Sequence, residues 1–121
     1  MAAIALLTDI PGAVESVFLN NQNELSKVGI YGVNVYALGV PHTIIVDDWM
    51  PFKLDRNKEN AEPLSAKLGK DNSVWPLILE KAIAKYHGNY YHLEGGLTLR
   101  PIQTLTGAPG KEIMTDGLTR E

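Results

Sequence analysis

The chain has 121 residues, of which 45% are hydrophobic and 21% charged, and its net charge is −3. This length and composition predict about one globular domain and argue against a disordered chain. No basic block or membrane-length apolar run is present, so nucleic-acid and membrane partners are not expected. The chain has no cysteine, which excludes disulfides and a cysteine nucleophile within it and is compatible with a reducing, cytoplasmic location.

The N-terminal part predicts two short helices. Residues 2–8 read as the last two turns of a buried helix that has no N-cap, as at a natural N-terminus or in a chain cut within a helix. Asp9 is expected to cap a second helix, with Pro11 in its first turn.

Two strand-like runs follow. Residues 29–38 alternate with the period of a strand, and residues 43–46 form a second run that ends at Asp47-Asp48. The Gly39-Val40-Pro41 segment is expected to be the turn of an antiparallel hairpin. Because two strands alone are barely stable, the hairpin must lie on helices or pair with a third strand. Residues 63–68, within a long charged connection, could add a short edge strand.

The strongest helical signal runs from residue 73 to residue 88. Ser73 or Asn72 is expected as the N-cap, and Gly88 as a left-handed C-cap. Apolar residues recur at steps of three and four, which predicts one buried helix face. These core residues are Trp75, Ile78, Leu79, Ala82, Ile83 and Tyr86. A further helix is expected near residues 101–105, followed by a turn at residues 106–110.

Few residues suggest chemistry. The histidines at positions 42, 87 and 92 do not have the spacing of a metal site, so no metal ligands are expected in this chain. Asp47 and Asp48 could be paired carboxylates for acid–base catalysis, but ending a strand is the favoured interpretation. Gly95-Gly96 either forms a turn or lets another backbone approach closely. The residues alone therefore predict an α+β domain without a complete active site.

Residues 75–90 resemble the W-x-x-L-L-E-K-A-Y-A-K-x-x-G-x-Y segment of calpain-type cysteine proteases. Residues 29–51 are similar to the family's G-I-F…G…V-V-V-D-D-x-x-P hairpin, residues 93–96 to its L-S-G-G and residues 105–107 to its F-T-G-G. The similarity extends over nearly the whole chain. It implies part of the papain-like fold, in which helices pack on a small antiparallel hairpin.

The resemblance also implies an intracellular endopeptidase that cleaves protein or peptide substrates with a Cys–His–Asn triad. The Cys would open the helix at residues 2–8 just before this chain begins, and the His and Asn would belong to a second lobe in cis. No catalytic residue is therefore expected here, and the chain alone is expected to be inactive. Residues 1–107 would be the first lobe, with Thr106 and Gly107 as a hinge, and residues 108–121 a flexible hinge and the start of the second lobe.

Two positions carry further implications of the resemblance. Gly95 and Gly96 match the family's glycine pair, whose second glycine pairs with substrate backbone, which implies a substrate-binding role. The family's first-lobe calcium site takes a carboxylate where this chain has Ser73, and a hydroxyl is a weaker calcium ligand. No cofactor is therefore expected in this chain, and the calcium dependence of the parent protein is expected to be weakened.

An alternative is a non-catalytic calpain-like protein, in which the lobe serves as a scaffold for protein interactions. The flanking sequence of the parent separates the two hypotheses. A Q-x-x-x-G-x-C-W segment upstream, with G-H-A and N-P-W downstream, would support the protease, and their absence would support the scaffold.

Overall fold

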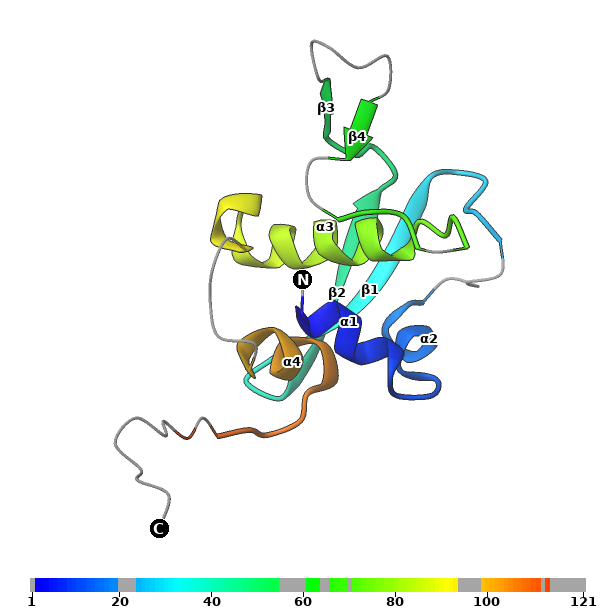
Figure 1. Ribbon diagram of the computed structural model, residues 1–121. Coiled ribbons are helices and arrows are strands. Elements are labelled where there is room, and N and C mark those ends of the chain that lie inside the picture. Colours follow the sequence, from blue (N-terminus) through cyan, green and yellow to red (C-terminus); the bar gives the residue numbers. More distant parts are fainter. Residues whose placement is uncertain are drawn as a thin grey trace.

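The computed structural model describes residues 2–19, 24–54, 61–63, 66–69, 71–93, 99–111 and 113. The elements in chain order are α1 (Ala2–Thr8), α2 (Ala13–Val17), β1 (Ile30–Ala37), β2 (Val40–Asp47), β3 (Phe52–Leu54), β4 (Ala61–Pro63), α3 (Trp75–His87), the 3₁₀ helix η1 (Tyr90–Leu93) and α4 (Leu99–Thr106). Figure 1 shows α3 lying across the β1–β2 hairpin, with the small β3–β4 hairpin projecting from the body. The predicted α+β class, with helices packed on a small antiparallel hairpin, is confirmed.

The β1–β2 hairpin is antiparallel, as predicted, but its turn lies earlier than expected. Ala37 pairs with Val40, so the two turn residues are Leu38 and Gly39, with φ of 51° and 81°. Left-handed φ at both central residues is the geometry of a tight type I′ turn, whose twist matches that of the strands. The prediction of a turn at residues 39–41 was therefore wrong, and Pro41 is a strand residue.

The hairpin pairs with a further extended segment and also lies on helices, the two alternatives that the sequence analysis named. The backbone N–H of Leu19 donates to the carbonyl of Gly32 at 2.9 Å, and Phe18 forms an isolated bridge with Val33, so residues 18–19 act as a short third strand. A Cβ atom at Gly32 would lie 2.9 Å from Cδ1 of Leu19, so a side chain at position 32 would require the Leu19 side chain to shift. The helices cover the inner face of the same hairpin.

The core lies between that inner face and the helices. Ile78, Leu79, Ala82 and Ile83 of α3 are buried, whereas Trp75 and Tyr86 at the ends of the predicted face are half-buried against the same cluster. The other buried members of the cluster come from five elements and the segment after α2. They are Ile4, Leu7, Val17, Phe18, Tyr31, Val33, Val35, Val46 and Leu105.

The start of α3 differs from the prediction. Its N-cap is Val74, which makes no side-chain capping hydrogen bond, and Asn72 has a left-handed φ of 62°. Ser73 does not cap the helix, because its hydroxyl accepts no N–H of the first turn; its N–H donates to Asp71 and its carbonyl accepts from Gly69, within a tight loop. The helix ends at Gly88, as predicted, with a φ of 99°.

The helix α3 is also buried more widely than one apolar face implies. Leu77, Glu80 and Ala84 lie off the predicted face and are buried as well. The residue Ala66, in the segment before α3, is buried next to Glu80, so the connection covers this second side of the helix. Periodicity missed this side because a charged residue interrupts it.

The second helix and the short strand before α3 lie at other positions than predicted. The second helix begins at Ala13, not just after Asp9, because Gly12 precedes it with a left-handed φ of 76°. The short strand before α3 covers residues 61–63, and it pairs with β3 in a separate sheet instead of extending the β1–β2 hairpin. Across the residues that the structure describes, no helix combines the length and apolar character that crossing a bilayer requires.

Candidate functional site

The predicted site residues fall into two groups. Gly95 and Gly96 lie outside the described residues, between η1 and α4, so their substrate-binding role stays a prediction. The hinge pair is described: Thr106 is the last residue of α4, and Gly107 follows it with a φ of 69°. Ser73 lies in the loop that leads into α3.

Two lysines of α3 hold the end of the hairpin. The ammonium of Lys81 donates to the carboxylate of Asp47 and to the carbonyl of Trp49. One helical turn later, the ammonium of Lys85 donates to the carbonyl of Ile45 at 2.7 Å. These contacts join α3 to β2 and to Trp49, but the Asp47 side chain is 59% exposed, so solvent screens the ion pair and packing sets most of the orientation of α3.

Asp47 acts in this anchor and not as half of a catalytic carboxylate pair. The hydrogen bond from Lys81, followed by the one from the Trp49 N–H, holds the pKa of Asp47 below its ordinary value of 3.8. The backbone bond spans two residues and measures 2.9 Å, which is the geometry of a turn that ends a strand. The favoured interpretation of the Asp47-Asp48 pair therefore agrees with the contacts of Asp47.

We expect Asp47→Asn to reduce the acid sensitivity of the fold. Because folding lowers the pKa of Asp47, its ionised form adds stability above pH 3.8, and this contribution is lost as the pH falls through the lower, folded pKa. Urea unfolding between pH 2 and pH 6 should show a shallower loss of stability below about pH 4 in the variant. Asp48→Asn is the matched control. Equal acid slopes for Asp47→Asn and the wild type would contradict the prediction.

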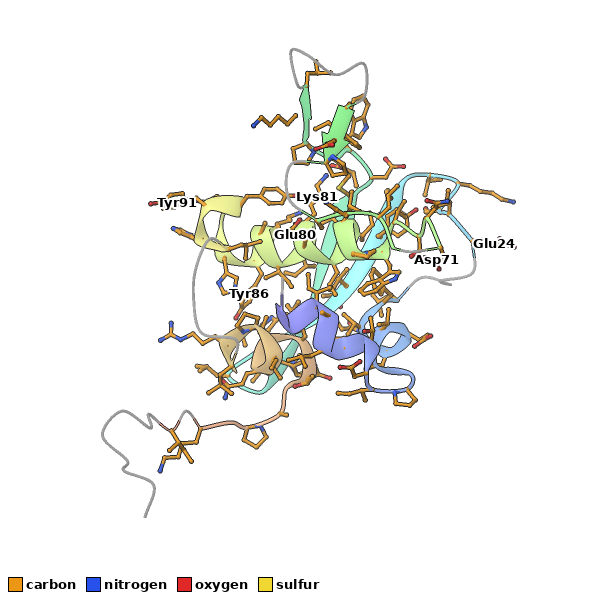
Figure 2. The ribbon with its side chains drawn as sticks, viewed as in Figure 1. Glu24, Asp71, Glu80, Lys81, Tyr86 and Tyr91 are labelled. Carbon is orange, nitrogen blue, oxygen red and sulfur yellow. The ribbon has the colours of Figure 1, made fainter. Side chains whose placement is uncertain are left out.

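Glu80 is the one buried acidic side chain among the described residues. Its Oε2 accepts the N–H of Ala66 at 2.9 Å, and Figure 2 shows it on the side of α3 that faces the β3–β4 arm. A small cleft beside it is lined by Met50, Pro63 and Tyr90. Burial raises the pKa of Tyr90, and the charges of Glu80 and Asp47 raise it further. Glu80 thus fixes the segment before α3 onto the helix.

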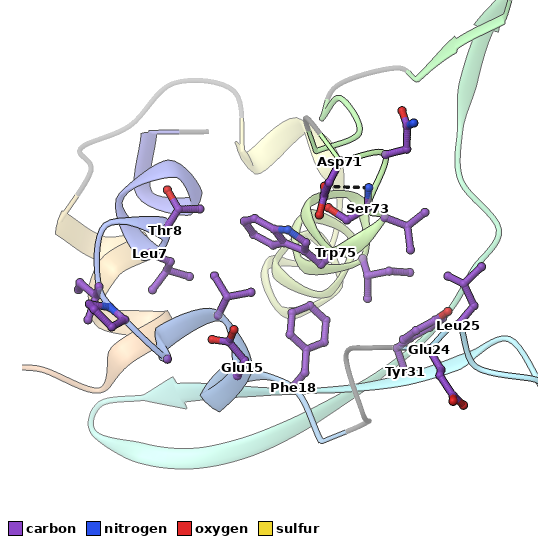
Figure 3. Close-up of a pocket in the computed structure, with 17 residues that line it drawn as sticks. Leu7, Thr8, Glu15, Phe18, Glu24, Leu25, Tyr31, Asp71, Ser73 and Trp75 are labelled. Carbon is purple, nitrogen blue, oxygen red and sulfur yellow. Dashed lines mark hydrogen bonds between the residues drawn. The ribbon is translucent and has the colours of Figure 1, made fainter.

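A pocket of about 650 Å³ opens on one side of the core. Figure 3 shows it between the C-terminal end of α1, α2 and the loop that precedes α3. Leu7, Phe18 and Trp75 supply apolar walls, and Glu15 and Asp71 supply carboxylates at its rim. The pocket thus has apolar walls and carboxylates at its rim.

Ser73 borders this pocket, and its hydroxyl is buried without a hydrogen-bond partner. The Ser73 hydroxyl and the Asp71 carboxylate both lie against the backbone of Gly69. A Cβ atom added at Gly69 would lie 2.6 Å from Asp71 Oδ1. The nearby Ser73 hydroxyl, whose geometry falls outside that of a hydrogen bond, and then the Ser73 N–H lower the pKa of Asp71. The loop is therefore compact and polar at the position where the resemblance expects a calcium ligand.

These residues do not make a calcium site by themselves. Calcium takes six to eight oxygen ligands, and Ser73 and Asp71 supply one hydroxyl and one carboxylate. In the described ranges, no group of three or more His, Asp or Glu side chains could hold a metal ion. Ser73 thus contributes a neutral oxygen where a carboxylate would supply charge.

The histidines of the helical region have structural contacts. His92 Nδ1 lies 2.8 Å from the carbonyl of His87, and the His92 N–H donates to Asn89 at 3.0 Å. His87 also meets the ring of Tyr86 edge-on, with centroids 5.0 Å apart. These contacts hold η1 against the end of α3. His42 is far along the chain on β2, paired with Val35.

Sequence reasoning did not find the roles of Glu80, Lys81 and Lys85. All three belong to the segment that carries the family resemblance, but the pattern alone does not say what they contact. The sequence did contain one indication of these roles, because charged residues are unexpected on a helix that is otherwise buried. A charged residue next to a buried face suggests a specific partner, although not which one.

The sequence matches the calpain family of cysteine proteases over residues 1–120. It is 38% identical over 113 residues to the calpain-type cysteine protease ADL1 of Oryza sativa subsp. japonica, and 37% identical over 113 residues to the calpain-type cysteine protease DEK1 of Zea mays. Each alignment covers 93% of this chain and 5% of the relative. The calpain-2 catalytic subunit of Gallus gallus is 32% identical over 108 residues, which cover 88% of this chain and 15% of that protein.

The chain thus spans a small part of the relatives that it matches. The match nevertheless runs through every described element, from α1 to the residues after α4. With the hairpin, the core helix and the glycine after α4 in the predicted order, the chain belongs to the calpain family of cysteine proteases.

Proposed function

We propose that this chain is most of the first lobe of a calpain-like intracellular cysteine endopeptidase, and that the lobe is inactive alone. The observation that carries the proposal is a family match over residues 1–120 in a chain that contains no cysteine. Amide cleavage by this class requires a thiolate, an adjacent base and oxyanion donors. The Cys, His and Asn of the triad would therefore belong to other parts of the parent protein, the latter two to a second lobe after residue 107.

In this proposal the chain supports the helix that carries the nucleophile. In the family the Cys opens the helix that corresponds to α1, so in the parent it would lie just before α1, whose Ile4 and Leu7 are buried in the common core. The helix α1 contacts both α3 and α4, and α3 is anchored to β2 by Lys81 and Lys85. The anchored core would hold the nucleophile at a constant position, which catalysis by orientation requires.

The purified chain should show no hydrolysis of peptide amide substrates, with or without calcium. A thiol-alkylating reagent is the control: because the chain has no cysteine, any activity that the reagent abolishes comes from a contaminant. Turnover that resists the reagent and copurifies with the folded chain would overturn the fragment proposal. Calcium should also leave the melting temperature unchanged, since Ser73 and Asp71 offer too few ligands.

We assign substrate backbone contact to Gly95 and Gly96 on the basis of the family match. An extended peptide that pairs with main chain needs room that a side chain at Gly96 would fill. In the intact parent enzyme, Gly96→Val should weaken the binding of a reversible peptidyl inhibitor. An unchanged inhibition constant would remove the assignment.

The alternative is that the parent is a non-catalytic calpain-like scaffold. The neutral Ser73 at an expected carboxylate position bears on the calcium dependence of the parent and does not distinguish the two. The sequence on either side of the chain decides between the two. A parent that lacks the Cys, the His or the Asn would be the scaffold, and one that retains all three would be the protease. The intracellular location, for which cell fractionation is the test, is compatible with the cysteine-free sequence.

A further inference from the structure

The end of α4 is closed by local hydrogen bonds. The N–H of Gly107 donates to the carbonyl of Gln103 at 2.9 Å, and the φ of 69° at Gly107 turns the chain out of the helix. The hydroxyl of Thr106 donates to the carbonyl of Ile102 at 2.8 Å and accepts the N–H of Ala108 at 3.2 Å. The predicted hinge pair therefore has defined partners on both sides of the helix end.

A side chain from the hairpin closes the same corner. A Cβ atom at Gly107 would lie 2.7 Å from Cδ1 and 2.9 Å from Cγ of Tyr36, so the backbone of Gly107 lies directly against this aromatic ring. Tyr36 is half-buried on β1, the strand on which α4 packs. Glycine is thus favoured at position 107 for two independent reasons, the left-handed φ and the ring contact.

The chain beyond this corner stays on α4. The side-chain amide of Gln103 donates to the carbonyl of Gly110 at 3.3 Å, and the Gly110 backbone lies against the side chain of Leu99. Figure 1 shows the segment after α4 turning back beneath that helix before it leaves the body. Residues 107–110 therefore follow a path that is set by contacts with α4 and β1.

We infer that Tyr36 and Gly107 form a fixed elbow, and that Tyr36 is a positioning residue which sets the direction in which the chain leaves this lobe. Any pivot toward a second lobe then lies after Gly110 and not at Thr106-Gly107. The consequence for lobe placement rests on the proposed function, but the elbow itself is a property of this chain. The contact joins β1 to the exit segment, so the orientation of the hairpin is transmitted to whatever follows.

The test measures the direction of the exit segment by pulsed electron paramagnetic resonance. Because the chain has no cysteine, spin labels can be attached at Glu15→Cys and Lys111→Cys, both of which are exposed. We expect a single narrow distance peak in the labelled chain and its loss in Tyr36→Ala. A labelled chain whose distances are as broad as those of Tyr36→Ala would overturn the proposal.

Two variants separate positioning from stability. Val35→Ala removes a fully buried side chain from the neighbouring position of β1, so it should lower the melting temperature but keep the narrow peak. Gly107→Asn keeps a residue that tolerates left-handed φ while adding a Cβ against the ring, so it should shift the distance peak. This variant also replaces Tyr36→Ala if the latter does not fold. An unshifted peak in folded Gly107→Asn would contradict the elbow.

The measurement needs neither catalysis nor a second lobe. A negative result in the spin-label experiment would remove the elbow and leave the protease proposal unchanged. Conversely, a parent without the catalytic triad would remove the protease proposal and leave the distance peaks as they are. The two inferences can therefore fail independently.

Discussion

Leu79→Ala should lower the free energy of unfolding by about 2–5 kcal/mol. Leu79 has no exposed surface and belongs to the same core cluster as Val33 and Val35 of the hairpin. Truncation removes buried apolar area and leaves a cavity between two rigid elements that cannot close it fully. Since domains of this size are stable by roughly 5–15 kcal/mol, this single change would remove a large part of the total.

Urea unfolding, followed by tryptophan fluorescence and by circular dichroism, measures this loss. Trp75 is half-buried at the start of α3, so its emission reports on the same helix. Leu54→Ala is the matched control, because Leu54 is 77% exposed on β3 and should change stability by less than about 0.5 kcal/mol. Similar losses for the two alanine variants would show that the core is not where the structure places it.

Glu80→Ala should cost about 1–3 kcal/mol of stability, because it leaves the buried N–H of Ala66 without an acceptor. Glu80 and Ala66 are 7% and 1% exposed, so water cannot readily replace the lost bond. The bond joins α3 to the segment that precedes it, and its loss should release that segment before the rest of the fold. Hydrogen exchange at the amide of Ala66 should therefore accelerate more than exchange within α3.

Glu80→Gln is the control for this prediction. The amide side chain keeps an oxygen that can accept the Ala66 N–H at nearly the same volume, so most of the stability and of the exchange protection should return. If Glu80→Gln is as destabilised as Glu80→Ala, the negative charge matters and the hydrogen bond does not. If neither variant differs from the wild type, the contact between Glu80 and Ala66 has no energetic role.

Local patterns predicted the elements that depend on neighbouring residues. The hairpin followed from a period of two, and α3 followed from a period near 3.6, because each period places its apolar residues on one face of the element. Both were correct in kind, and the C-terminal end of α3 at Gly88 was correct, but the hairpin turn and the start of α3 were wrong by one or two residues. The ends depend on turn geometry, such as the left-handed Leu38-Gly39 pair and the Asp71–Ser73 loop, which short patterns determine only weakly.

The resemblance supplied the functional interpretation, and composition limited it. The absence of cysteine could be read directly, and it excludes a cysteine nucleophile from this chain. The roles of Gly95 and Gly96 came from matching a motif and not from physical properties of the two residues. Their spacing alone favoured a turn, although glycine serves both purposes for the same steric reason.

The sequence by itself thus determined the α+β class, the hairpin, the core helix and the membership of the family. Only the tertiary structure decided which charged residues support that core. Lys81 meets Asp47 from 34 positions away, and Glu80 meets Ala66 from 14 positions away. A sequence pattern treats Tyr36 as a strand residue and Gly107 as a hinge, but in the structure the ring of Tyr36 lies against the backbone of Gly107. Such contacts depend on how the elements pack, because no local period relates residues that only folding brings together.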